Sequence, residues 1–208
     1  MRHIIFDLDN TIYPKEIGLF TLVDKRINEY MKAKLYLDHN SIEHLRLKYM
    51  YEFGTTLGGL IAHYGIDPDE YLSFVHDIDL KGLLFYNPRL SKLMENIILD
   101  KVIFTNGSKD HALRVLDILG IKDYFSEIFD IEFMNYMAKP NPLSYQKVLN
   151  TLGAEGKECL IVEDLAVNLM PAKNMGMTTV LIGDDRTTGV DYMIEDIFGI
   201  ENVLNEIG

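Results

Sequence analysis

Carboxylate side chains stand directly after short apolar runs at several places in this chain. The pairs are Asp7 with Asp9, Glu163 with Asp164, and Asp184 with Asp185. Carboxylates that are brought to one place repel one another unless a proton or a cation lies between them. Oxygen ligands in this number suit Mg²⁺. The residue types therefore predict a magnesium site, provided that the fold brings the pairs together.

The apolar runs that precede these pairs have the length and composition of buried parallel strands. We expect strands at residues 3–6, 102–104, 128–131, 159–162 and 179–182. Because the carboxyl ends of parallel strands meet at one edge of a sheet, the side chains that follow these runs should share that edge. Thr105 and Asn106, which follow the second run, should lie there as well.

Helical patterns separate the predicted strands. Ser108 and Asn141 have the character of N-caps, and the helices that they begin should end at Gly120 and Gly153. Asn168 is predicted to cap a third helix, with the nearby proline in its first turn. Strand and helix therefore alternate from about residue 100 onward. This order predicts an α/β fold with a doubly wound parallel sheet and right-handed crossovers.

The segment between the first two predicted strands shows only helical periodicity. We expect helices near residues 19–35, 45–50, 57–64 and 69–76. This pattern predicts an all-helical cap at residues 15–86, inserted after the first strand of a core made of residues 1–14 and 87–208. An insertion at the carboxyl edge of a parallel sheet lies over the ligand crevice and can exclude water from it.

The composition excludes several classes of protein. The chain has 208 residues, 48% of them hydrophobic and 25% charged, which is typical of a globular protein. Its formal net charge of −12 argues against a nucleic acid polymer as a partner, because phosphate backbones require a basic face. No apolar run reaches the length of a membrane span. With its single cysteine, Cys159, the chain is expected to be cytoplasmic.

Four motifs, in order, resemble those of the haloacid dehalogenase superfamily. Residues 7–11 (DLDNT) resemble its nucleophile motif DxDxT, and Thr105 with Asn106 resembles its second motif. Lys139 resembles the third motif, and the acidic pair at 163–164 resembles the fourth. The resemblance implies a Rossmann-like core, Mg²⁺ as cofactor and a small-molecule phosphate ester as substrate.

The resemblance also implies a role for each residue. Asp7 would attack phosphorus and form an aspartyl-phosphate, while Asp9 would protonate the leaving oxygen and then take a proton from water. Lys139 would neutralise the phosphoryl oxygens, and Thr105 and the main-chain N–H of Asn106 would bind the phosphate. Mg²⁺ would be held by Asp7, the main-chain carbonyl of Asp9, Asp164 and, directly or through water, Glu163. Thr11 would orient the loop, and Asn168 would support the acidic pair as well as cap its helix.

A narrower resemblance concerns residues 7–14, 53–60, 71–76 and 104–112, which are similar to the pyrimidine 5′-nucleotidase branch. That branch removes phosphate from nucleoside monophosphates such as UMP and CMP. Tyr13, Thr55 and Thr56 are then candidates to contact the base or sugar. Leu165 differs from the serine that the branch usually has after its acidic pair. We expect His111 on a helix surface and His76 packed within the cap.

Two alternatives to a phosphatase remain at this point. The Glu163-Asp164 pair is also found in β-phosphoglucomutase relatives, so a sugar phosphomutase of the same fold is possible. A protein that binds a phosphorylated metabolite without turning it over, as a regulator, is the other alternative. Dehalogenation is disfavoured, because Asp9 would then have no task and Lys139 alone would not need Mg²⁺.

Overall fold

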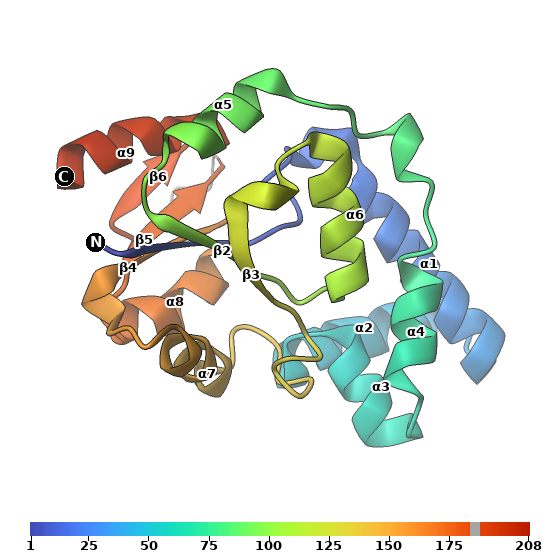
Figure 1. Cartoon of the computed structure of the whole chain (residues 1–208). Coiled ribbons are helices and arrows are strands. Elements are labelled where there is room, and N and C mark those ends of the chain that lie inside the picture. The colour runs from blue at the N-terminus through green and yellow to red at the C-terminus, as the bar shows by residue number, and fades with distance from the viewer. Residues whose placement is uncertain (184–187) are drawn as a thin grey trace.

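A parallel sheet forms the centre of the computed structural model, which describes residues 1–183 and 188–208 (Figure 1). Its strands are β1 (His3–Phe6), β2 (Asp100–Phe104), β3 (Phe125–Phe129), β4 (Cys159–Glu163), β5 (Thr178–Ile182) and β6 (Tyr192–Ile194). Their order across the sheet is β3-β2-β1-β4-β5-β6. Because the chain runs outward from β1 in one direction and then returns to β4 on the other side, the sheet is doubly wound. The predicted fold class is confirmed.

Helices cover both faces of this sheet. Residues that alternate along β1 point to opposite sides: Ile4 and Phe6 belong to one apolar cluster, and Ile5 belongs to the other. The first cluster includes residues of α5 (Pro88–Asn96), α6 (Lys109–Leu119) and α9 (Ile200–Ile207), and the second includes residues of α7 (Pro142–Leu152) and α8 (Ala166–Asn174). Since both faces are covered, β1 is buried throughout, and the three residues that follow His3 in it are all apolar.

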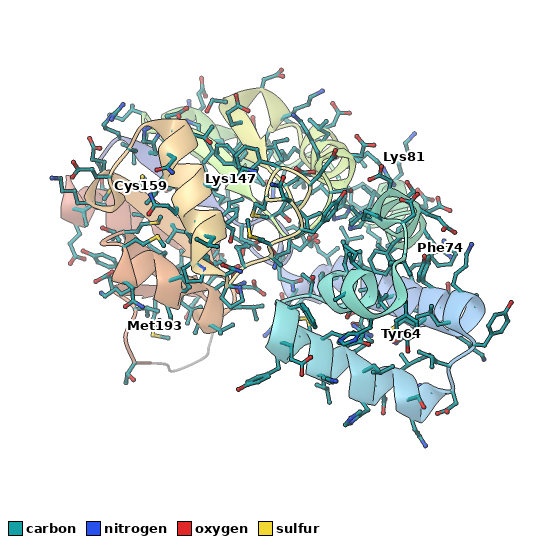
Figure 2. The ribbon with its side chains drawn as sticks, turned by 90° about the horizontal axis from the view of Figure 1, so that it is seen from below. Tyr64, Phe74, Lys81, Lys147, Cys159 and Met193 are labelled. Carbon is teal, nitrogen blue, oxygen red and sulfur yellow. The ribbon has the colours of Figure 1, made fainter. Side chains whose placement is uncertain are left out.

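Helices α1 (Leu19–Leu35), α2 (His39–Phe53), α3 (Thr56–Tyr64) and α4 (Pro68–Val75) form the helical insertion between β1 and α5. Tyr64 and Phe74 mark α3 and α4 at one end of the molecule, and Cys159 marks β4 toward the other end (Figure 2). Helix α1 contributes to both apolar clusters: its Leu19 packs in the first cluster and its Tyr30 in the second. The Tyr30 ring meets the ring of Tyr71 edge-on, with centroids 5.0 Å apart.

The predicted helix ends are confirmed in two cases and wrong in one. Ser108 and Asn141 cap α6 and α7, which end before Gly120 and Gly153. Helix α8, however, begins at Ala166, so Asn168 lies inside it and is not its N-cap. The helix starts early because the carboxylate of Glu163 already accepts the N–H of Leu165. Pro171 consequently lies inside the helix instead of in its first turn.

The third strand begins and ends earlier than the prediction of residues 128–131. Asp130 leaves the sheet because its carboxylate accepts the main-chain N–H groups of Lys109 and Phe133.

The structure contains three elements that the sequence patterns do not predict: strand β6 and helices α5 and α9. Asp184 and Asp185 lie outside the described residues. Within the described part of the chain, no helix combines the length and the apolar character that crossing a bilayer requires.

Candidate active site

Asp7 follows the central strand and lies between the ends of its two neighbours. Phe6, the last residue of β1, pairs with Ile103 of β2 on one side and Val162 of β4 on the other. The main-chain N–H of Asp7 donates to the carbonyl of Val162 at 2.9 Å, which extends the ladder by one bond. Asp7 therefore stands at the point where the strand order reverses, the usual place for a ligand in such sheets.

The ammonium group of Lys139 is buried beside Asp7. It donates hydrogen bonds to Oδ1 of Asp7 at 2.7 Å, to Oε1 of Glu163 at 2.9 Å and to the carbonyl of Phe104 at 2.8 Å. These bonds use all three donors of the ammonium group. Burial alone would lower the pKa of Lys139, but the charges of Asp7 and Glu163 outweigh burial and raise it above its usual range. Lys139 is therefore a fixed positive charge.

Two other segments hold the main chain of Lys139 in place. The side-chain amide of Asn106 donates to the carbonyl of Lys139 at 3.1 Å and accepts its N–H at 2.8 Å. The turn between α2 and α3 approaches the same carbonyl: a Cβ added to Gly54, whose φ is +77°, would lie 2.4 Å from the carbonyl oxygen. The motifs predict a phosphate-binding role for Asn106 but do not indicate this pair of hydrogen bonds to Lys139, which we call the Asn106 clamp.

Asp7, Glu163 and Asp164 form an acidic cluster in which one oxygen of each lies within 4.8 Å of the others. Burial raises the pKa of Asp7 to about 7, where Glu163 acts in the same direction and Lys139 opposes it. Burial, Glu163 and Asp7 together raise the pKa of Asp164 to about 8. A bound cation can replace the protons on such carboxylates and stabilise their ionised form. The spacing and the hard oxygen donors fit a divalent ion such as Mg²⁺.

The members of the acidic pair differ in how their oxygens are used. Oε1 of Glu163 accepts from Lys139 and, at 2.5 Å, from the amide of Asn168, and Oε2 accepts from the N–H of Leu165 at 2.7 Å. Asp164 accepts one long bond of 3.4 Å from Asn10. Asp164 is thus the more available ligand of the two, while Asn168 orients Glu163.

Asp9 has two partners of its own. Its Oδ1 accepts hydrogen bonds from the phenol of Tyr13 at 2.5 Å and from Nε2 of His111 at 2.9 Å. Burial alone would raise the pKa of Asp9, but the charge of His111 and these two hydrogen bonds lower it to about 2. Asp9 is therefore held as a carboxylate. Tyr13, a candidate for substrate contact, is buried against Asp9.

His111 is buried, so the prediction that it lies on the helix surface is wrong. The sequence contains the signal that locates it: His111 stands one turn before Val115 and next to Ala112, two residues of the apolar stripe of α6. His76 packs against it with the ring planes stacked, 4.4 Å between centroids.

The remaining predicted residues lie around this centre. Thr105 is buried at the end of β2, and its hydroxyl oxygen accepts the N–H of Gly107 at 2.9 Å. The hydroxyl of Thr11 is buried and has no hydrogen-bond partner within the described residues. Thr55 caps α3 by accepting the N–H of Gly58, and Thr56 is buried behind it. No hydrogen bond within residues 1–183 and 188–208 joins Thr55 or Thr56 to the acidic cluster.

This fold and this arrangement of an aspartate, a buried lysine and an acidic pair define a class of hydrolases. Residues 1–176 match the family model of haloacid dehalogenase-like hydrolases, and the chain belongs to this family. The resemblance seen in the four motifs is therefore confirmed at the level of the superfamily.

Among individual proteins, the chain is 29% identical to phosphate metabolism protein 8 of Saccharomyces cerevisiae over 217 residues, which cover 97% of this chain and 64% of the yeast protein. The chain thus spans less than two thirds of that relative. In structure it is similar to a haloacid dehalogenase-type phosphatase from Thermococcus onnurineus, with a TM-score of 0.65, 22% identity and 98% coverage of both chains. The magnesium-bound putative hydrolase YfnB of Bacillus subtilis gives a TM-score of 0.66 at 19% identity, again with 98% coverage of both chains. At these identities the structural likeness supports the fold alone.

Proposed function

We propose that this chain is a Mg²⁺-dependent phosphatase that hydrolyses small phosphate monoesters through an aspartyl-phosphate on Asp7. The observation that carries the proposal is the setting of the Asp7 carboxylate, 2.7 Å from the buried ammonium of Lys139 and within an acidic cluster suited to a divalent ion. The name of the yeast relative, a phosphate metabolism protein, supports a reaction on phosphate.

Charge repulsion is the first obstacle to the reaction. Two unit charges about 4 Å apart interact by roughly 4 kcal/mol at an effective dielectric near 20, and the Asp7 carboxylate must approach a phosphate dianion. Lys139 offsets this repulsion. Asp7, Asp164 and the main-chain carbonyl of Asp9 would hold Mg²⁺, with Glu163 as a direct or water-mediated partner. When bound, the ion supplies further positive charge against the phosphoryl oxygens.

In the first step, a carboxylate oxygen of Asp7 attacks phosphorus and the bond from phosphorus to the leaving oxygen breaks. Asp9, a carboxylate in the substrate-free protein, takes up a proton from solvent as the negatively charged phosphate ester binds, and gives it to that oxygen. In the second step, Asp9 as a carboxylate takes a proton from the water that attacks phosphorus, and the Asp7–phosphorus bond breaks to release inorganic phosphate. Thr105 and the N–H of Asn106 bind the phosphoryl oxygens. Thr105 keeps its O–H donor for this, because Gly107 uses only a lone pair.

Helices α1–α4 would act as the cap of this site. We propose residues 15–86 as a cap domain and residues 1–14 and 87–208 as the catalytic core. The contact between Gly54 and the carbonyl of Lys139 supports this assignment, because it brings the α2–α3 turn to the loop that carries the lysine. The neighbouring Thr55 and Thr56 are the residues of that turn that we assign to the substrate. A closed cap would exclude water from the first step.

The substrates that we propose are nucleoside 5′-monophosphates, with pyrimidines preferred. The support is the similarity of residues 53–60, 71–76 and 104–112 to the pyrimidine 5′-nucleotidase branch. The Glu163-Asp164 pair supports a sugar phosphomutase as the second candidate. In that reaction the phosphoryl group would pass from Asp7 to a hydroxyl of the sugar and not to water.

A panel of phosphate esters tests the proposal. UMP, CMP, AMP, GMP and common sugar phosphates are incubated with the protein and Mg²⁺ or with EDTA. We expect phosphate release that requires Mg²⁺, is greatest with UMP and CMP, and is lost in Asp7→Asn. Asp110→Asn, the same change at an exposed position of α6, is the matched control and should keep full activity. A rearranged sugar phosphate would support the phosphomutase, and no turnover across the panel would overturn the assignment as an enzyme.

A further inference from the structure

Asp9 is tied to the two segments that connect the helical insertion to the sheet. Tyr13, which donates to Oδ1 of Asp9, lies in the segment that leads from β1 into α1. His111 of α6 donates to the same oxygen, and its ring stacks on His76 at an interplanar angle of 11°. His76 is the residue at which α4 ends and the chain turns back toward the core.

The segment around His76 is fastened to α6 by further contacts. Nδ1 of His76 lies 2.9 Å from the hydroxyl of Ser108, the N-cap of α6. The guanidinium of Arg114, three residues after His111 in α6, donates to the carbonyls of His76 at 2.8 Å and Ile78 at 2.5 Å. These bonds fix the ring of His76 with respect to α6, where it stacks on the ring of His111.

The orientation of the His111 ring depends on its stack with His76. A buried imidazole that binds a carboxylate through one nitrogen is commonly oriented by a hydrogen bond at the other nitrogen. Nδ1 of His111 is buried and has no such partner within the part of the chain that the structure describes. The stack on His76 takes the place of that hydrogen bond and limits rotation of the ring.

We propose that His111 is a positioning residue for Asp9, and that its stack on His76 makes the direction of the Asp9 carboxylate depend on the segment by which α1–α4 rejoin the core. The inference rests on the proposed function, in which Asp9 transfers protons at the leaving oxygen. A shift of about 1 Å in a reacting group can cost about 100-fold in rate. A ring that holds Asp9 while the cap is seated would therefore restrict efficient proton transfer to that arrangement.

The dependence of rate on the leaving group separates this role from a structural one. An alkoxide leaving group such as that of UMP needs a proton, whereas p-nitrophenolate leaves without one. The quantity to compare is kcat/KM, because it reports the steps up to loss of the leaving group and excludes the later attack of water. His111→Phe keeps a ring for the stack and removes the hydrogen bond to Asp9. We expect kcat/KM for UMP to fall about 100-fold, within the range for general acid catalysis, and kcat/KM for p-nitrophenyl phosphate to change less than about threefold.

Further variants make the test independent of the folding of one protein. His111→Gln keeps an N–H donor and should recover much of the rate with UMP. His76→Ala removes the stack and keeps both hydrogen-bond donors to Asp9, Tyr13 and His111, and it should show the same selective loss, at about tenfold. His3→Gln is the matched control, because His3 is also buried, binds the carboxylate of Asp100 at 2.9 Å and lies at the opposite end of β1. It should leave both rates unchanged.

The outcomes distinguish this inference from the proposed function. If the wild-type protein hydrolyses both esters but His111→Phe and His76→Ala lose rate equally on both, or lose none with UMP, the positioning role is wrong and the phosphatase assignment stands. If the wild-type protein hydrolyses neither ester, or Asp7→Asn is as active as the wild type, the proposed function itself is wrong and the inference with it.

Discussion

The Lys139 ammonium lies 2.7 Å from Oδ1 of Asp7, although 132 positions separate the two residues in the chain. The second carboxylate on this ammonium, that of Glu163, is almost completely buried, and so is the lysine. A buried charge is tolerated when it is paired and hydrogen-bonded on all sides, as this ammonium is. The contact places a compensating charge beside Asp7 before any substrate arrives.

Replacement of Lys139 should therefore affect both activity and stability. In Lys139→Met, two buried carboxylates lose their shared cation, and we expect a loss of about 3–5 kcal/mol in the free energy of unfolding, as for other broken buried pairs. We expect kcat to fall at least about 100-fold, because a fixed charge near the developing transition state is lost. Urea unfolding in EDTA and phosphate release measure the two effects.

Lys101→Met is the matched control for this prediction. Lys101 is also buried, but its ammonium donates to the carbonyls of Ile97 and Leu99, at the opposite edge of the sheet. It should lose stability and keep its kcat. Wild-type kcat in Lys139→Met would show that the ammonium does not take part in the reaction.

Mg²⁺ should stabilise the protein more at pH 8 than at pH 6. In the absence of a cation, burial raises the pKa of Asp7 to about 7 and that of Asp164 to about 8. Because the folded state then binds protons more tightly than the unfolded state, these two groups lower the stability as the pH rises from about 4 through 8. Mg²⁺ replaces the protons and removes this loss.

Thermal unfolding with and without Mg²⁺ at the two pH values measures this effect. The increase in Tm caused by Mg²⁺ should be larger at pH 8, and Asp164→Asn should show a smaller difference between the two pH values. An equal or smaller increase at pH 8 in the wild type would mean that these carboxylates do not exchange protons for the cation.

The two acidic residues after β4 should differ in their effect on the metal. Both oxygens of Glu163 are already bound by Lys139, Asn168 and Leu165, whereas Asp164 accepts only a long bond from Asn10 among the described residues. Glu163→Gln should weaken Mg²⁺ binding by about tenfold, as is usual for a residue that supports the ligands. Asp164→Asn should weaken it more, as measured by titration calorimetry. The reverse order would make Glu163 the principal ligand.

Local patterns in the sequence predicted the fold and the approximate location of the site. Apolar runs and cap residues such as Ser108 depend on neighbours in the chain, and the sheet edge then follows from strand direction. The clamp of Asn106 on Lys139 and the bond from His111 to Asp9 depend on contacts between distant elements, so the motifs alone did not reveal them. Strand β6 was missed because it is a short edge strand with a partly exposed sequence, including Met193.

The close approach of the α2–α3 turn to the lysine loop gives a further prediction. In Gly54→Ala the new Cβ would lie 2.4 Å from the carbonyl oxygen of Lys139, so the turn and the loop must separate. Gly65→Ala places alanine at the matching cap of α3, also at positive φ, with no atom within 4 Å. Both should lose about 1 kcal/mol from backbone strain, measured by urea unfolding, but only Gly54→Ala should also lose activity. Equal activity in the two variants would show that the contact has no part in the reaction.

The covalent state of Asp7 during turnover is the most direct test of the account. The protein is mixed with substrate and Mg²⁺, quenched within one turnover and treated with borohydride, which reduces an acyl phosphate to the alcohol. Mass spectrometry of the amino-terminal peptide should then find homoserine at position 7 in the wild type and not in Asp7→Asn. Phosphate release by the wild type with an unmodified Asp7, or with the reduced residue at another position, would contradict the assignment of Asp7 as the nucleophile.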